Sequence, residues 1–215
     1  MRVGILGSGD VARTLGNGFG TLGHELKIGT RHPEQPKVQE WLKGSPGKRM
    51  VGSFADAAEF GEVVVVATLG VATAEAVRAA GPARFRGKVV IDTTNPLVFH
   101  ENAPPSLAIG TTTSAGEELQ KLLPEARVVK AFNIIGNAHF FRPNFPGGPP
   151  DMYICGNDAA AKTTVTEILH SFGWPSVIDL GGIEGSRELE SLCVLWVKTA
   201  LRFGSWDLAF KVLRK

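Results

Sequence analysis

The chain begins with a short apolar run that leads directly into a glycine-rich turn. Residues 2–6 read RVGIL, and the pattern G-x-G-x-x-A follows at once, with Gly7, Gly9 and Ala12 in its fixed positions. Apolar residues at helical spacing come next, and a second apolar run follows at residues 26–29. A strand, a glycine turn, a helix and a second strand in this order are the context in which the pattern indicates a dinucleotide-binding site.

Each small residue of the pattern has a physical role in binding a dinucleotide. Gly7 allows the tight turn, Gly9 lets the backbone approach a pyrophosphate, and Ala12 allows close packing of the helix on the strand. The start of the helix offers free N–H groups and a partial positive charge to the phosphates. We therefore expect the pyrophosphate at this turn.

The residues that follow the second strand indicate which dinucleotide binds. NAD-binding folds place an acidic residue here, which accepts a hydrogen bond from the ribose 2′-OH. This chain has Thr30, Arg31 and His32 instead, with no acid to oppose them. Arg31 can bind a 2′-phosphate with two N–H groups and lay its plane on the adenine. The sequence therefore predicts a preference for NADP, with Gln35 or Lys37 as further phosphate contacts.

Apolar runs of strand length alternate with helical patterns along the chain, as a parallel sheet requires. With 215 residues, of which 43% are hydrophobic, the chain can form one large α/β domain with a sizeable core. We expect a Rossmann-type, doubly wound, mainly parallel sheet. The predicted strands cover residues 2–6, 26–29, 50–52, 62–67, 88–92, 126–130, 152–155 and 176–179. The continuous valine run within 62–67 predicts a central strand that is buried on both faces. The predicted helices, besides the one after the glycine turn, are near 38–42 and 54–58, with Ser53 as a candidate cap of the latter, over 159–172, and in the tail from 184 to 213, interrupted at Gly204.

Composition and spacing argue against several other classes of protein. The formal net charge of +2 is too small to indicate a nucleic-acid or membrane partner. The longest apolar stretch, residues 63–74, is broken by Gly70 and too short to span a bilayer, and nothing resembles a signal peptide, so we expect a cytoplasmic protein. Cys155 and Cys193 are expected to be buried thiols. The five histidines have no metal-ligand spacing, so no metal site is expected.

Polar residues follow three of the predicted strands, where ligands of open α/β sheets bind. Thr68 and Leu69, after the strand at 62–67, are candidates to border the nicotinamide ribose. Asn95, which precedes Pro96, and Asn133 are candidates to hydrogen-bond a carboxamide or a substrate carbonyl. The alternative for these amides is turn chemistry, because Asn-Pro commonly starts a turn.

Six segments together resemble the deazaflavin-dependent NADP oxidoreductases, a group that also contains the reductase domain of the six-transmembrane metalloreductases. The segment at residues 185–192 is the most specific of the six, because Rossmann folds in general lack it. The segments are the glycine turn, Thr30-Arg31, residues 92–96 (DTTNP), 129–133 (VKAFN), 154–158 (ICGND) and 185–192 (GSRELESL).

The resemblance implies an NADP-binding Rossmann domain over residues 1–182 and a helical segment over 183–215 that covers the cofactor cleft. It also implies a homodimer, and hydride exchange between NADPH and 8-hydroxy-5-deazaflavin (coenzyme F420). The residues implied in cofactor contact are Ser8, Gly9, Asp10 and Val11 at the pyrophosphate, Thr30 and Arg31 at the 2′-phosphate, and Thr68 and Leu69 at the nicotinamide.

The chain departs from the archaeal pattern of that family at two places near the chemistry. Leu69-Gly70 replaces Pro-Trp, and Asn133 replaces a histidine. NADP binding is compatible with both changes, but the second substrate stays open. A flavin, or another small-molecule redox acceptor, is therefore also considered.

Hydride transfer asks little of side chains, because stacking of two rings and exclusion of water supply most of the effect. No catalytic constellation is evident, so no catalytic residue is assigned. His139 is a candidate proton donor or an ordinary surface or core histidine. The Pro- and Gly-rich segment 142–151 is either a lid or a connection. Two alternative functions are an NADPH-dependent reductase of a small C=O or C=N compound, and a non-catalytic NADP-binding sensor.

Overall fold

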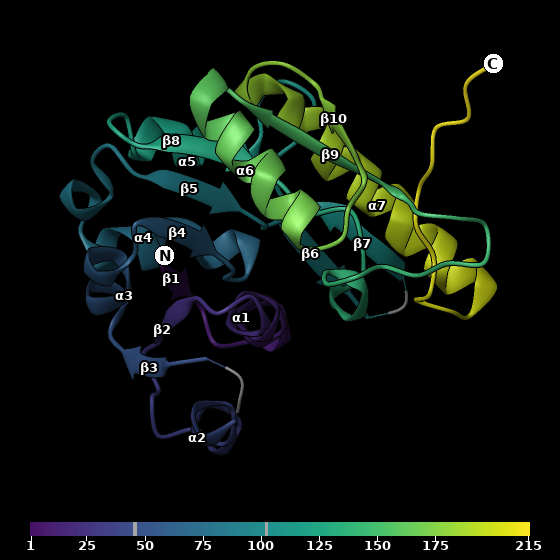
Figure 1. The fold of residues 1–215 in the computed structure, drawn as a ribbon. Helices are drawn as coiled ribbons and strands as arrows, with labels where there is room; N and C mark the ends of the chain where they lie inside the picture. Colours follow the sequence, from purple (N-terminus) through teal and green to yellow (C-terminus); the bar gives the residue numbers. More distant parts are fainter. Residues whose placement is uncertain (45–46, 102) are drawn as a thin grey trace.

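The computed structural model describes residues 1–44, 47–101 and 103–215. Its centre is an eight-stranded sheet with the order β10-β9-β8-β5-β4-β1-β2-β3 (Figure 1). The strands of this sheet are β1 (Arg2–Leu6), β2 (Glu25–Gly29), β3 (Arg49–Gly52), β4 (Val63–Val66), β5 (Val89–Asp92), β8 (Arg127–Lys130), β9 (Asp151–Gly156) and β10 (Ser176–Asp179). The strands β6 (Leu97–His100) and β7 (Ala103–Leu107) form a separate antiparallel pair.

The helices are α1 (Asp10–Thr21), α2 (Pro36–Lys43), α3 (Phe54–Phe60), α4 (Thr73–Ala80), α5 (Ala115–Leu122), α6 (Ala159–Ser171) and α7 (Ser186–Phe203). Short 3₁₀ turns are η1 (Gly70–Ala72), η2 (Pro82–Phe85), η3 (Asn137–His139) and η4 (Ile183–Gly185). The predicted α/β class with a mainly parallel sheet is confirmed. Within the sheet, β3, β2, β1, β4, β5 and β8 run parallel to one another. Strand β9 is antiparallel to β8 and parallel to β10.

Alternation along the central strands divides the core into two layers, because successive side chains point to opposite faces of a sheet. Val63 and Val65 of β4 belong to the layer formed with α1 and α6. Val64 and Val66 belong to the layer formed with α3, α4 and α5. The predicted burial of this valine run on both faces is therefore confirmed, and it makes β4 a central strand.

The sequence analysis predicts a helical tail to residue 213, but in the structure the helix ends earlier. Helix α7 ends at Phe203, because Gly204 adopts the left-handed conformation, with φ of 65°. The remaining residues turn back along the molecule, and the Phe210 carbonyl accepts a hydrogen bond from the Asp151 N–H at 3.1 Å. Leu208 and Phe210 pack against Trp196 as an extended strap. Their apolar character is thus satisfied without a helix, which is why the periodicity misled the prediction.

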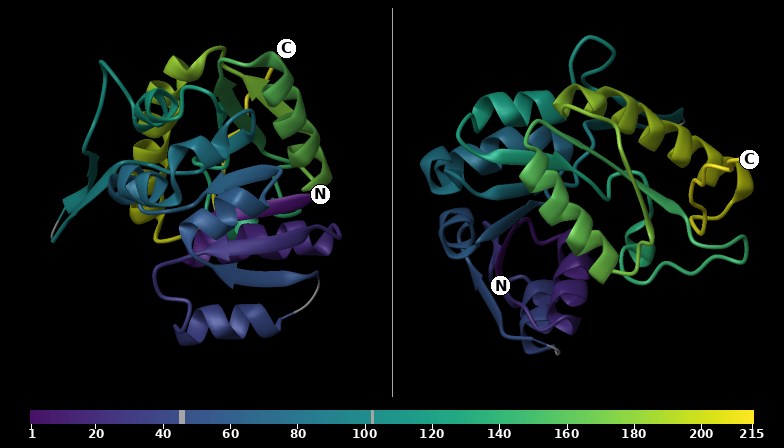
Figure 2. Two further views of the ribbon diagram at one scale, coloured as in Figure 1. Left: turned by 90° about the vertical axis from the view of Figure 1, so that its left-hand side faces the viewer. Right: turned by 45° about the horizontal axis from the view of Figure 1, so that its top comes forward.

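The β6–β7 hairpin, which the sequence analysis did not predict, projects from the body of the molecule (Figure 2). It leaves the main sheet directly after the Asn95-Pro96 turn and contacts α7 through β7 and η1 through β6. Pro104 and Pro105 lie within β7. Proline cannot donate to a strand ladder, so this position suits a two-stranded sheet with open edges.

Three further expectations can be compared with the described residues. Both cysteines are buried and free, and burial raises the pKa of Cys155 to about 11 and that of Cys193 to about 12. Within the described ranges, no set of three His, Cys, Asp or Glu side chains is arranged to hold a metal ion. Outside residues 45–46 and 102, no helix combines the length and apolar character needed to cross a bilayer.

Candidate cofactor site

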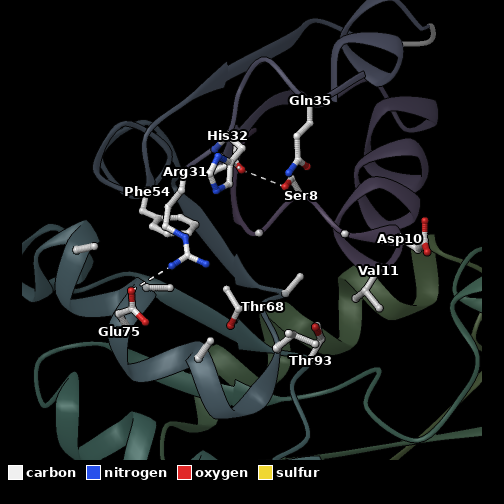
Figure 3. A pocket seen from close by; sticks show the side chains of 18 of the residues that line it. Ser8, Asp10, Val11, Arg31, His32, Gln35, Phe54, Thr68, Glu75 and Thr93 are labelled. Atoms are coloured by element: carbon white, nitrogen blue, oxygen red, sulfur yellow. Dashed lines mark hydrogen bonds and ion pairs between the residues drawn. The ribbon is translucent and has the colours of Figure 1, made fainter. Parts of the chain in front are cut away.

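A cavity of about 600 Å³ lies at the carboxyl ends of β1, β2, β4 and β5 (Figure 3). Strands β1 and β4 are neighbours, and the helices that follow them, α1 and α4, pack on opposite faces of the sheet, so the two connections diverge and open a crevice at this point. The predicted residues that line the cavity are Gly7, Ser8, Gly9, Asp10, Val11, Thr30, Arg31, His32, Gln35, Thr68 and Leu69, whereas Lys37 is not among its lining residues. The other lining residues are Phe54, Ala67, Ala72, Glu75, Ala76, Ala79, Thr93 and Asn137.

The two glycines of the turn are required for different reasons. Gly7 has φ of 116°, and a Cβ there would lie 2.3 Å from the Ala67 carbonyl oxygen. The fold itself therefore excludes a side chain at position 7. Gly9 has an ordinary φ of −71°, and a Cβ there would meet nothing within 4 Å. Position 9 leaves open space above the start of α1, where a ligand can approach.

The N-terminus of α1 is free to bind an anion. Its N-cap, Gly9, has no side chain to accept from the first N–H groups. Asp10 places a carboxylate at this end, but Arg13 forms an ion pair with it and also donates to the Ser8 carbonyl at 2.6 Å. Arg13 thereby neutralises Asp10 and braces the turn. Sequence analysis missed Arg13, although its three-residue spacing from Asp10 on a helix was a signal.

A hydroxyl pair joins the glycine turn to the end of β2. Ser8 Oγ lies 3.0 Å from Thr30 Oγ1, and the same Thr30 oxygen accepts from the His32 N–H at 3.2 Å. Thr30 is buried, whereas the Arg31 side chain is exposed. This end of the cavity therefore has a buried polar base and an exposed cationic side chain.

The corner at Arg31 is not free of acid, and that expectation was wrong. Arg31 Nη1 lies 3.1 Å from Glu75 Oε1, and the two side chains reach toward one another from opposite sides of the cavity (Figure 3). Glu75 belongs to α4, 44 residues further along the chain. His32 Nδ1 also lies 3.5 Å from Glu34 Oε1. Only the fold brings Glu75 to this corner, so reading the residues after β2 could not reveal it.

Small residues of α4 form one wall of the cavity. Ala76 and Ala79 are three residues apart, so they share one face of the helix, and Ala72 of η1 precedes them as the N-cap of α4. Phe54 of α3 adds an aromatic surface close to Arg31 (Figure 3). This wall is flat and apolar, as a stacked aromatic ring requires. The helical spacing of these alanines is visible in the sequence and could have indicated the wall.

The opposite end of the cavity carries hydroxyls and an exposed leucine. Thr68 Oγ1 lies 2.9 Å from Thr73 Oγ1, which ties the end of β4 to the start of α4. Thr93 donates to the Val66 carbonyl at 3.0 Å. Leu69 extends outward from this end and is 71% exposed. The polar groups here are thus held by the protein, and Leu69 offers apolar surface to a ligand.

Asn95, Pro96 and Asn133 are not among the residues that line the cavity. Asn95 Nδ2 donates to the Asn133 carbonyl at 2.8 Å, and Asn133 Nδ2 donates to Asn95 Oδ1 at 2.9 Å. Asn133 Nδ2 also donates to the Leu189 carbonyl at 3.0 Å. These amides join two strand ends to α7, an arrangement closer to the turn-chemistry alternative than to direct ligand contact.

A buried charge cluster stands behind these strand ends. Lys130 Nζ lies 2.8 Å from Asp92 Oδ2 and 3.0 Å from Glu190 Oε1, and it donates to the Thr94 carbonyl at 2.8 Å. Burial by itself would lower the pKa of Lys130, but the two carboxylates outweigh it and hold the pKa above its ordinary value. Glu190 in turn accepts from the first N–H groups of α5. Helix α7 therefore supports the site from behind.

The remaining candidates lie away from the cavity walls. His139 Nε2 lies 2.9 Å from Asp207 Oδ1 in the C-terminal strap. The segment 142–151 contacts the same strap, where Lys211 Nζ donates to the Pro149 carbonyl at 3.0 Å. None of the lining residues belongs to this segment. Its contacts are those of a connection packed on the tail.

Comparison with known proteins gives matches over the whole chain. The model of the family described as NADP oxidoreductase, coenzyme F420-dependent, matches residues 2–96. The crystal structure of a candidate F420-dependent NADP reductase from Arthrobacter sp. FB24 is 38% identical, covers 99% of both chains and has a TM-score of 0.93. The F420-dependent NADP reductase of Methanocaldococcus jannaschii is 27% identical over 225 residues, covering 99% of this chain and 98% of that protein.

A second group of relatives is much longer than this chain. Rat metalloreductase STEAP3 is 29% identical over 191 residues, which are 89% of this chain but 36% of that protein. This chain thus spans about a third of that relative. Three observations indicate the same family. They are the full-length likeness to the Arthrobacter structure, the family match over the glycine turn, and the crevice beside β1. The chain belongs to the coenzyme F420-dependent NADP oxidoreductase family and is an NADP-dependent oxidoreductase.

Proposed function

We propose that this protein transfers hydride between NADPH and a flat, multi-ring acceptor of the deazaflavin or flavin class. The observation that carries this proposal is an apolar rim at the Leu69 end of the cavity. Leu69 is 71% exposed and Val71, on η1, is 62% exposed. Strand β6 packs beside η1 and exposes Phe99. Large exposed apolar side chains beside a cavity are typical of a binding surface for an apolar ring system.

The cofactor placement follows from the cavity walls. The pyrophosphate binds at the start of α1, along residues 7–11, where N–H groups are free. The 2′-phosphate binds at Thr30, Arg31 and His32, with the adenine against the alanine wall of α4. The nicotinamide lies at Thr68 and Leu69. Asn95, Pro96 and Asn133 hold the strand ends under the nicotinamide.

The proposed reaction needs no acid from the protein. The hydride leaves nicotinamide C4 of NADPH with both electrons and adds to the central ring of the oxidised acceptor, while a solvent proton completes the reduced acceptor and NADP⁺ is released. At the Leu69 end, the polar side chains among the described lining residues are Thr68, Thr93 and Asn137. A reductase of small C=O or C=N compounds requires a proton donor about 3 Å from the reacting atom. The chemistry of this end therefore favours the ring acceptor.

We further propose that the protein is a homodimer that works in the cytoplasm, with a Rossmann unit over 1–182 and a helical extension over 183–215. Helix α7 leaves the side chains of Leu195, Leu201 and Phe203 exposed, and a second copy would cover them. The two buried thiols are unpaired, which is usual in a reducing compartment.

The test is the oxidation of NADPH against a panel of acceptors: 8-hydroxy-5-deazaflavin, FMN, FAD, ferric chelates, quinones, a cyclic ketone and a cyclic imine. We expect turnover with the deazaflavin or a flavin, and transfer of deuterium from NADPH labelled at C4 into the reduced deazaflavin. Turnover confined to the ketone or imine would establish the small-substrate alternative. Tight NADPH binding without oxidation by any acceptor would favour the sensor.

A further inference from the structure

The ion pair between Arg31 and Glu75 closes one end of the cofactor cavity. Glu75 lines the cavity, yet neither the sequence pattern nor the proposed reaction accounts for a carboxylate at this position. We propose that Glu75 is a specificity-determining residue: it holds Arg31 in competition with the 2′-phosphate and thereby restrains the preference for NADPH over NADH. This inference rests on the proposed placement of the 2′-phosphate at Arg31.

The geometry makes the exchange of partners easy. Arg31 Nη1 and Glu75 Oε1 are 3.1 Å apart, and the two side chains are 62% and 72% exposed. Exposed ion pairs of this kind contribute little stability, since water screens both charges. A phosphate monoester brings nearly two negative charges and three acceptor oxygens, so it outcompetes one carboxylate for the guanidinium.

The cost of that exchange falls on one coenzyme only. When Arg31 turns to the 2′-phosphate, the Glu75 carboxylate loses its partner. The loss of this ion pair lowers NADPH affinity. NADH has a hydroxyl in place of the phosphate, so Arg31 can keep its contact with Glu75 while NADH binds. Glu75 therefore changes the ratio of the two affinities.

Glu75 can be neutralised with little change in the shape of its side chain. It lies in the first turn of the helix, where an acidic residue interacts favourably with the helix N-terminus. Glutamine keeps the length and the hydrogen-bonding capacity of glutamate at this position. Glu59 on α3 provides a matched control: it is 72% exposed, lies 3.5 Å from Arg84, and is not among the residues that line the cavity.

The experiment measures dissociation constants for NADPH, NADH, adenosine 2′,5′-bisphosphate and AMP. The proteins are the wild type, Glu75→Gln, Glu59→Gln, Arg31→Ala and the Arg31→Ala/Glu75→Gln double variant. We expect Glu75→Gln to bind NADPH and the bisphosphate about two- to fivefold more tightly, the range for loss of an exposed ion pair. NADH, AMP and all affinities of Glu59→Gln should stay unchanged. In the Arg31→Ala background the gain should vanish.

Several outcomes would overturn the proposal. These are no gain in NADPH affinity, an equal gain for NADH, and a gain that persists without Arg31. The melting temperature of each variant shows whether it is folded, and the tightened binding of one coenzyme cannot arise from unfolding. If the wild type binds neither coenzyme, the proposed function fails as well. If Arg31→Ala loses NADPH while Glu75→Gln changes nothing, only the present inference fails.

Discussion

Neighbouring glycines in one turn are constrained by the fold to different degrees. At Gly7 the positive φ and the nearby Ala67 carbonyl make any side chain incompatible with the native backbone. At Gly9 the protein itself would tolerate a methyl group. A sequence pattern treats both positions alike. The structure separates them, and this separation makes a clean test of phosphate binding possible.

We expect Gly9→Ala to fold normally but to weaken NADPH and NADH alike, by roughly tenfold or more, because the methyl group occupies the space that the pyrophosphate needs. Isothermal titration calorimetry gives the affinities and differential scanning calorimetry the melting temperature. Gly147→Ala is the matched control, since a Cβ there also meets nothing within 4 Å. Unchanged affinity for both coenzymes in Gly9→Ala would contradict the proposed position of the pyrophosphate at this turn.

At the scale of elements, α7 is fastened to the Rossmann core by charged groups of the segment 185–192. Arg187 donates to both oxygens of Glu117 on α5, at 2.8 Å from Nε and 2.6 Å from Nη2. Glu190 reaches Lys130 and the start of α5. Ser186 Oγ lies 3.3 Å from Cys155 Sγ. The most distinctive segment of the sequence thus has a structural role next to the site.

This fastening predicts an acid-sensitive contribution to stability. Hydrogen bonds from Arg187 hold the pKa of Glu117 below its ordinary value. A depressed folded-state pKa stabilises the protein above the unfolded-state pKa of about 4.3, and the contribution is lost as the pH falls through the folded-state pKa. We expect Arg187→Ala to lower the free energy of unfolding at pH 7, because it removes both hydrogen bonds to Glu117.

Urea denaturation of both proteins between pH 7 and pH 3 measures this contribution. The difference between wild type and Arg187→Ala should shrink once the pH falls below about 4. Lys121→Ala serves as the control, because Lys121 pairs with Glu118 on the exposed side of the same helix. A difference that stays constant across the whole range would show that Arg187 acts by packing alone.

At the scale of the whole molecule, exposed apolar side chains near the end of α7 bear on the proposed dimer. Leu201 and Phe203 are both exposed, although other residues of the same helix pack on the body of the protein. We expect sedimentation equilibrium to give twice the mass of one chain, and Leu201→Glu to shift the mass toward that of a monomer. Leu180→Glu, an exposed leucine after β10, should leave the mass unchanged. A monomeric wild type would contradict the dimer.

Much of this molecule follows from local patterns in the sequence. The valine run of β4, the glycine turn, and Ser53 as the cap of α3 were predicted from neighbouring residues, and the structure contains all three elements. The Ser53 cap forms a reciprocal hydrogen-bonded pair with Asp56. These features depend on backbone sterics, burial and hydrogen bonds within a few residues, which the order of amino acids expresses directly.

Other features depend on contacts between residues far apart in the chain. Glu75 meets Arg31 only because α4 and the end of β2 flank one crevice. The apolar tail after Gly204 is extended because Trp196 and the body of the protein offer it a surface. By itself, the sequence determined the Rossmann sheet and the phosphate turn, since both arise from local conformational preference. Only the tertiary structure decided which charge faces Arg31 and where the tail runs, because electrostatics and burial act through space.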